Sequence, residues 1–199
     1  MGVYVDEFLK WNTLIQHVAS TKMSKNIGII TRLQYKLPRH ILLMLYDTLI
    51  LPYLNYCNIV WAATYPTRLQ KLVILQKRAI RVITGSDGLA HTSPLFKSLN
   101  LLKVPDINVL QTALFVFSSK HDLLPQACSG YFIHNLDIHQ HYTRSCSKYH
   151  FSCVSTNIRK YSIRYNGPLI WNSIPESIKA SVSTVVFKKT VKHYLIDKY

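Results

Sequence analysis

The side chains best suited to bind a ligand in this sequence are two clusters of cations. The first cluster lies on a predicted amphipathic helix over residues 68–84, and its members are Arg68, Lys71, Lys77, Arg78 and Arg81. On a helical wheel they lie opposite an apolar face that only Gln76 interrupts. Such a face can bind the phosphates of a nucleic acid. A solvated face on an ordinary surface helix shows the same pattern, so the rest of the sequence has to decide.

The second cluster mixes basic and aromatic side chains in a segment, residues 126–166, for which we predict mostly irregular structure. Its cations are Arg144, Lys148, Arg159, Lys160 and Arg164, and its aromatic residues are Tyr142, Tyr149, Phe151, Tyr161 and Tyr165. This mixture suits contacts with the phosphates and stacked bases of a single strand. The tyrosines could equally well anchor an irregular segment to a core.

The distribution of charge favours an anionic partner. The chain has 199 residues and a net charge of +15, although only 17% of its residues are charged. Asp47 is the only acid between residues 8 and 86, against eleven Lys and Arg, and no acid occurs between residues 138 and 175. Nucleic acid is the commonest polyanion for such a surface. An anionic membrane surface or an acidic protein is the alternative.

The most apolar stretch, residues 41–63, approaches the length that spans a membrane. Asp47, Pro52, Asn55 and Asn58 interrupt it. An Asp at the centre of a membrane helix is unfavourable by about 2.5–3.5 kcal/mol. We therefore expect a buried helical pair here and no membrane among the partners.

The acidic residues do not form a catalytic pattern. Polymerases hold two metal ions about 3.5–4 Å apart between paired carboxylates. The nine acids are scattered, and the adjacent pair Asp6-Glu7 lies at a predicted helix start. No Walker loop, HExxH or GxSxG motif occurs. We predict that the chain is not an enzyme by itself and takes no cofactor.

The four cysteines give no sign of a disulfide framework. None forms a CxxC pair, and the N-terminal residues lack the apolar core of a signal peptide. We expect reduced thiols in a nuclear or cytoplasmic protein, not a secreted one. Cys146 and Cys153 lie near His141 and His150, but the spacing fits no common zinc pattern.

The elements that position the cations are predicted to be helices. Helical patterns cover residues 8–34, 38–50, 53–63 and 68–84, with Thr67 a candidate cap for the last, while residues 2–5 alternate like the end of a strand. Prolines start two further helices near residues 94 and 105, and a closing helix begins at about residue 184. The predicted fold is mainly α, a helical bundle followed by a smaller helical and irregular C-terminal region.

One set of motifs spans nearly the whole chain. Its members are Gly2-Val3, Asp6, Leu9 and Trp11; Leu45-Tyr46, Pro52, Tyr56, Trp61, Leu72 and the run Gln76 to Gly85; Ser93-Pro94-Leu95-Phe96, Gln111 and Thr143-Arg144; and Gly167, Trp171-Asn172 and Pro175. Together they resemble the region that follows the palm domain in reverse transcriptases of non-LTR, LINE-type (jockey-like) retrotransposons.

The resemblance implies a domain organisation and a partner. Residues 1–88 would form a thumb-like helical bundle that begins at the end of a primer-grip strand, and residues 89–199 a post-thumb C-terminal region. Because the thumb of this family closes over the template–primer duplex, the implied partners are RNA and an RNA–DNA hybrid or DNA duplex. The ten cations of the two clusters are the expected contacts.

The resemblance also implies what is missing. The family's palm carboxylates and endonuclease have no counterpart here, and the sequence begins where the family has further strand. The expected function is therefore that of a non-catalytic C-terminal fragment of an RNA-directed DNA polymerase. The alternative is a protein-interaction or scaffold fragment whose basic faces dock a separate palm domain or another acidic partner.

Overall fold

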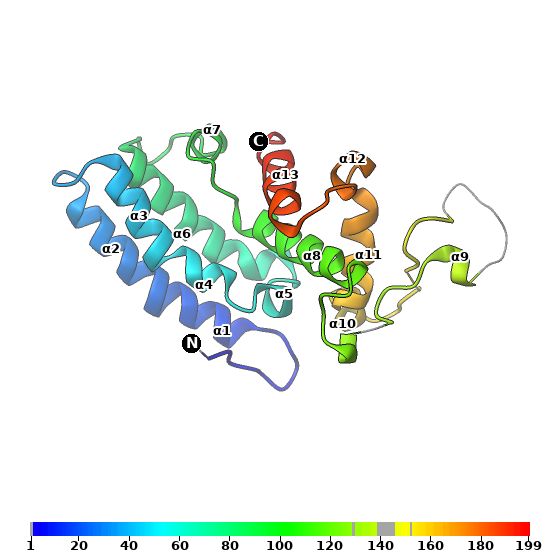
Figure 1. Cartoon of the computed structure of the whole chain (residues 1–199). Helices are drawn as coiled ribbons and strands as arrows, with labels where there is room; N and C mark the ends of the chain where they lie inside the picture. Colours follow the sequence, from blue (N-terminus) through cyan, green and yellow to red (C-terminus); the bar gives the residue numbers. More distant parts are fainter. Residues whose placement is uncertain (1, 129, 139–145, 152) are drawn as a thin grey trace. The chain divides into compact units, whose positions relative to one another are not determined.

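The structure is a computed structural model that describes residues 2–128, 130–138, 146–151 and 153–199 (Figure 1). These residues fold into helices joined by loops and form no strand, which confirms the mainly α fold class. Within them, no helix combines the length and the apolar character needed to span a bilayer. The chain divides into two compact units: residues 1–107 with 195–199, called the first unit, and residues 108–194, called the second unit.

The first unit opens with one long helical rod. It consists of α1 (Asn12–His17), a π-helical segment (Val18–Met23) and α2 (Ser24–Leu33). The hydroxyl of Ser24 donates a hydrogen bond of 2.8 Å to the carbonyl oxygen of Ala19, five residues back, as the wider turn of a π-helix allows. The predicted helix began at residue 8. The rod starts later because Leu9 and Trp11 have φ values of 50° and 61°, which a right-handed helix does not accept.

Three further segments return along this rod and end beside it. They are α3 (Arg39–Leu49), α4 (Leu51–Asn55) and α5 (Asn58–Trp61). The single helix predicted over residues 53–63 is broken because Cys57 has a φ of 50°. In Figure 1, α3 runs back next to α2, and the basic helix α6 (Pro66–Thr84) then runs in the same direction as α2.

Helix α6 buries the apolar face that its sequence predicted. Leu69, Leu72, Ala79, Ile80 and Ile83 are buried together with Gln76, whereas Val73 is only half-buried. The helix begins at Pro66, one residue before the predicted cap, because proline is favoured in the first turn. It ends at Gly85, whose φ of 66° allows the backbone N–H of Ser86 to bond the carbonyl oxygen of Arg81 at 3.0 Å.

The N-terminal segment differs from the prediction. Residues 2–5 form no strand. A strand needs a partner with free backbone groups, and no strand occurs among the described residues. The segment instead lies over the rod, where the ring of Tyr4 is 5.0 Å from that of His17.

The remaining part of the first unit is short. It contains α7 (Ser93–Ser98), the start of α8 (Val104–Lys120) and the C-terminal residues. The hydroxyl of Tyr199 donates to Asp106 at 2.6 Å and accepts from the backbone N–H of Lys103 at 2.9 Å. These bonds fix the last residue of the chain to the start of α8.

The second unit is built around aromatic side chains. After α8 it contains a 3₁₀ turn (Gln126–Cys128), α9 (Asn135–Ile138), α10 (Asn157–Lys160), α11 (Ile163–Ser173), α12 (Glu176–Lys179) and most of α13 (Thr184–Ile196). Phe117 stacks on Phe187 at 4.4 Å, and Trp171 is buried beside them. The side-chain amide of Asn172 bonds both backbone groups of Tyr149, at 2.9 and 3.2 Å. Trp171 and Asn172 thus hold the loop that contains Tyr149 to the aromatic core of the second unit.

The two compact units meet in the chain within α8, between residues 107 and 108. The division predicted after residue 88 concerns the end of a thumb-like region, which compactness does not define. That division stays a prediction.

Candidate nucleic-acid interface

Two of the predicted cations line an open groove between α1 and α6. Its walls are Asn12, Thr13, Ile15 and Gln16 from α1 and Arg68 and Lys71 from α6, and they enclose about 560 Å³. The ammonium of Lys71 donates to the side-chain oxygen of Gln16 at 2.8 Å. The groove therefore combines two cations with neutral hydrogen-bonding groups, which is the set of side chains that binds phosphate oxygens in nucleic-acid complexes.

Arg68 is held in place on one side only. Its Nη1 atom donates to the carbonyl oxygen of Lys10 at 2.9 Å and lies 3.4 Å from the hydroxyl of Thr64. Its guanidinium lies 4.9 Å above the ring of Tyr65. No described residue accepts a hydrogen bond from Nε or Nη2 of Arg68, so these donors can bind a phosphate in a fixed direction.

The remaining cations of α6 differ in exposure and in position around the helix. Arg78 is exposed two turns after Lys71, about 10 Å further along the axis, and lies on the same side of the helix. Lys77 is half-buried and lies about 100° away from Arg78 around the helix, so it does not share that side. In the part of the chain that the structure describes, no carboxylate contacts any of the five cations.

Arg81 has a structural partner that the sequence did not indicate. Its Nε and Nη2 atoms donate to the carbonyl oxygen of Ala90 at 3.0 and 2.9 Å. This pair of bonds closes the loop that follows α6. Arg81 contributes positive charge to the face, but its guanidinium is already committed to the backbone.

Two cations of the second cluster come together in the second unit. Arg159 and Arg164 line a cavity of about 240 Å³ with Val154, Ser162 and Tyr165. The guanidinium of Arg164 lies 4.4 Å above the ring of Tyr131. Both arginines are exposed, so they present a small cationic surface beside an aromatic ring.

The other predicted cations of this cluster are not part of that cavity. Lys160 is exposed at the end of α10. Lys148 is also exposed, and its carbonyl oxygen accepts a bond of 3.0 Å from the backbone N–H of Asn135. Arg144 lies outside the described residues.

The aromatic residues of the second cluster divide into core and surface. Tyr149 is buried and stacks on His134 at 4.3 Å, and burial raises the pKa of its hydroxyl. It anchors the loop, which is the alternative that the sequence left open. Phe151 is exposed and meets Tyr165 edge-on at 6.2 Å. Tyr161 is half-buried, and Tyr142 lies outside the described residues.

The sequence did not reveal the part that α1 plays. Asn12 and Gln16 lie in the helix predicted over residues 8–34 and were not among the expected contacts, yet they line one wall of the groove. Their spacing of four residues places them on one side of a helix. That signal shows a shared face, but only the packing of α1 on α6 shows which cations lie opposite.

Metal ligands do not gather in the described residues. These contain no group of three or more His, Cys, Asp or Glu side chains that could hold a metal ion. The four cysteines are free thiols, and His150 lies 3.3 Å from the side-chain oxygen of Asn135. His141 lies outside the described residues.

Comparisons with protein families, with curated protein sequences and with solved structures found no match to this chain.

Proposed function

We propose that this chain binds nucleic acid through the groove between α1 and α6, as the non-catalytic C-terminal fragment of a non-LTR retrotransposon reverse transcriptase. The observation that carries the proposal is the arrangement of Arg68, Lys71 and Arg78. These three cations lie along one side of α6 without a carboxylate partner among the described residues, and polar groups of α1 face two of them.

The chemistry of this surface suits a duplex backbone. A nucleic-acid duplex presents regularly spaced phosphates along its length, and cations two turns apart on a rigid helix can each meet one of them. Asn12, Thr13 and Gln16 add neutral groups that bind phosphate or sugar oxygens without reading the sequence. Binding should therefore depend strongly on salt and weakly on base sequence.

The second unit would add a contact of a different kind. Arg159 and Arg164 supply charge, and the rings of Tyr131 and Tyr165 lie beside them. This combination suits an unpaired strand, whose bases are free to stack. The first unit should therefore prefer a hybrid duplex and the second unit an unpaired strand, the two forms of nucleic acid that a template–primer contains.

The first test is fluorescence anisotropy with a labelled RNA–DNA hybrid, titrated over a range of salt concentrations beside single-stranded RNA. We expect tight binding at low salt, with a slope of log affinity against log salt that steepens by about 0.9 for each duplex phosphate contacted. A folded protein that binds neither probe at low salt would contradict the proposal.

We also propose that this chain does not catalyse DNA synthesis by itself. The sequence lacks the paired carboxylates that hold the two metal ions of a polymerase. Primer extension by this chain should therefore stay at background even when the hybrid is bound. Incorporation of nucleotides by the purified chain would refute this part.

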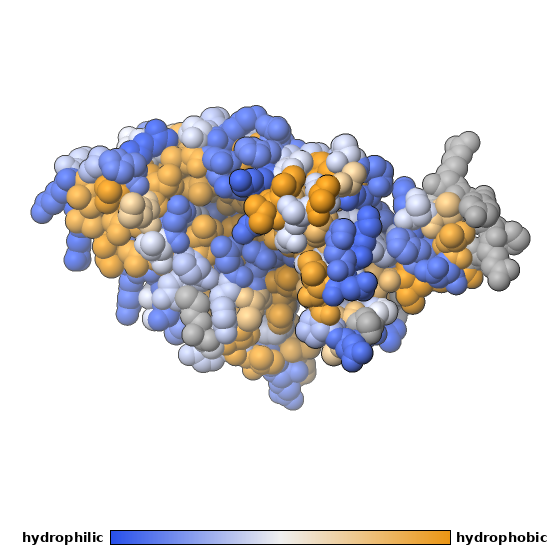
Figure 2. Space-filling model, viewed as in Figure 1, coloured by the Kyte–Doolittle hydropathy of each residue, from blue (hydrophilic) through white to orange (hydrophobic). Residues whose placement is uncertain are grey.

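A protein-interaction function is the second candidate, and exposed apolar side chains favour it. Ile29, Met44 and Val60 are 45%, 56% and 53% exposed. Figure 2 shows apolar residues gathered over α2 and α3 among hydrophilic ones. Surfaces of this kind commonly mark protein contacts. If the basic faces dock a palm domain, a palm fragment added in trans should suppress self-association of this chain, and nucleic acid alone should not.

A further inference from the structure

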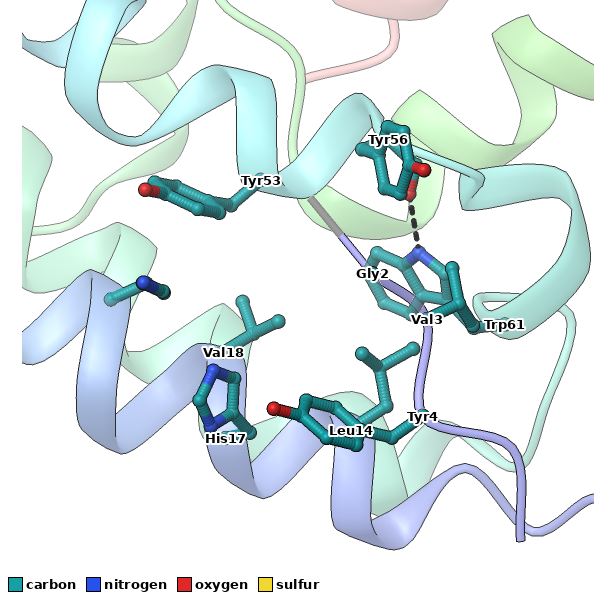
Figure 3. A pocket seen from close by; sticks show the side chains of 10 residues that line it. Gly2, Val3, Tyr4, Leu14, His17, Val18, Tyr53, Tyr56 and Trp61 are labelled. Carbon is teal, nitrogen blue, oxygen red and sulfur yellow. Dashed lines mark hydrogen bonds between the residues drawn. The ribbon is translucent and has the colours of Figure 1, made fainter.

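A second concave site lies on the other side of the helical rod from the basic groove. It is a cavity of about 330 Å³ between the N-terminal segment, the rod and the region of α4 and α5 (Figure 3). Its lining residues are Gly2, Val3, Tyr4, Leu14, His17, Val18, Lys22, Tyr53, Tyr56 and Trp61. All of them belong to the first unit.

The cavity has an apolar floor and aromatic walls. Trp61, Leu14 and Val18 are buried, and the indole N–H of Trp61 donates to the carbonyl oxygen of Tyr56 at 2.8 Å, which fixes the ring. Figure 3 shows Tyr53 on one side of the cavity and Tyr4 with His17 on the other, with the side chain of Val18 between them in this view. A flat molecule that enters the cavity meets aromatic side chains from the N-terminal segment, the rod and α4.

One cation lies at the edge of this space. The ammonium of Lys22 is 5.6 Å from the centre of the Tyr53 ring, and Lys22 forms no ion pair with any described residue. The π-helical segment carries both Lys22 and Val18 into the lining. Short π-helical segments occur frequently at functional sites because they alter which side chains a helix presents.

We propose that this cavity binds a nucleotide, with the base against its aromatic walls and the phosphate on Lys22. A nucleobase has a flat π-face that stacks on aromatic side chains, and its phosphate carries the charge that a lysine binds. The lining contains Lys22 and no carboxylate, so its charge favours an anionic ligand over a cationic one. The volume lies at the lower end of the range for ligand sites and admits a base with its sugar.

The nucleotide can come from two sources. It can be a free mononucleotide, or an unstacked nucleotide of a bound strand. The proposal does not require the basic groove, because the cavity contains its own cation and its own stacking surfaces.

The experiment is an NMR titration of the full chain with AMP, with adenosine, and with a short single-stranded RNA. We expect AMP to shift resonances of Tyr4, His17, Lys22 and Tyr53 with a dissociation constant on the order of 1 mM. Adenosine should bind about tenfold more weakly, because it lacks the phosphate that pairs with Lys22. Binding of the RNA but not of AMP at this site would assign the cavity to a strand, and binding of AMP would assign it to a free nucleotide.

Matched variants separate the roles of the lining residues. Lys22→Ala should remove the preference for AMP over adenosine, whereas Lys25→Ala, an exposed lysine on the same rod outside the lining, should not. Tyr53→Ala should weaken the binding of AMP and of adenosine by about fivefold or more. Replacement of Tyr35, which is exposed at the surface, by Ala should leave the binding of both unchanged. If none of the three ligands shifts the lining residues in the folded chain, or if the control variants act as strongly as the lining variants, the proposal is wrong.

Discussion

Gln76 is the polar residue on the buried face of α6, and its hydrogen bonds explain why it is accepted there. Its side-chain nitrogen donates to the hydroxyl of Tyr46 and to the carbonyl oxygen of Leu102, both at 2.9 Å. Its side-chain oxygen accepts from the backbone N–H of Val104 at 2.9 Å. One fully bonded amide thus connects α6 with α3 and with the start of α8. The sequence showed a polar interruption, but not its partners, which are 26 to 30 residues away.

Replacement of Gln76 by Leu should destabilise the first unit. Leu fills a similar volume but leaves the N–H of Val104 and the carbonyl of Leu102 buried without partners. We expect a loss of about 1–3 kcal/mol in the free energy of unfolding, measured by chemical denaturation. Gln70→Leu, at an exposed position of the same helix, should change it by less than about 0.5 kcal/mol. Equal effects of the two variants would show that the Gln76 bonds contribute nothing.

Tyr46 predicts a dependence of stability on alkaline pH. Burial, with a smaller contribution from Asp47, raises the pKa of its hydroxyl well above the ordinary value of 10.0, although the bond from Gln76 acts in the opposite direction. The unfolded chain therefore releases this proton at a lower pH than the folded chain. The contribution of the Tyr46 hydroxyl to the free energy of unfolding is fully present below pH 10 and falls as the pH rises above it.

The check compares unfolding at neutral and alkaline pH. Tyr46→Phe should lower stability at neutral pH by about 1 kcal/mol, because Gln76 loses an acceptor. It should also reduce the further loss above pH 10. Part of that loss should remain, since the pKa of Tyr199 is raised by burial and by its bond to Asp106. Tyr35→Phe, which is 91% exposed, should leave the pH dependence unchanged.

At the scale of the element, the end of α6 depends on one backbone conformation. Gly85 has a φ of 66°, and the resulting turn positions Ala90 to accept the two bonds from Arg81. Gly85→Ala should destabilise the first unit by about 1 kcal/mol, since a side chain disfavours this region of φ. Gly88→Ala is the matched control, because this glycine has no positive φ and open space around it. The measurement is the midpoint of thermal unfolding of the two variants. Identical midpoints would show that the backbone conformation of Gly85 does not contribute to stability.

Helices could be predicted from the sequence where signals from neighbouring residues define them, and could not where contacts between distant residues do. The apolar period of α6 and its glycine end are local signals that predicted the helix, whereas its start at Pro66 replaces the predicted cap at Thr67. Cys57 and Trp11 adopt positive φ although neither residue type prefers it, so the break before α5 and the late start of α1 could not be read locally. The groove required the packing of α1 on α6, which no periodic pattern specifies.

At the scale of the whole molecule, both compact units are strongly basic. The first unit has 14 Lys and Arg against 6 acids, and the second has 10 against 3. The exposed cations differ in their neighbours: polar groups of a helix in the first unit, aromatic rings in the second. If the chain binds nucleic acid as proposed, this difference in surroundings at similar net charge leads us to expect that the two units prefer different forms of it.

Charge reversal should separate these preferences. Lys71→Glu with Arg78→Glu should weaken binding of the RNA–DNA hybrid and reduce its salt slope by about 1.8, for two duplex contacts. Arg159→Glu with Arg164→Glu should act mainly on single-stranded RNA, with a reduction of about 1.4. Arg81 is left intact in this design, because its bonds to Ala90 would confound binding with folding.

The control for that comparison is Lys36→Glu with Lys188→Glu, which changes the net charge equally at exposed positions outside both sites. If this variant weakens the binding of the hybrid and of single-stranded RNA as much as the other variants do, the chain binds through its overall charge, and neither surface is a specific site. If each site variant instead acts on its own ligand, the two surfaces prefer different forms of nucleic acid. A hybrid with a single-stranded extension then tests whether one ligand can occupy both surfaces: it should bind more tightly than either part alone if it does, and no more tightly if it does not.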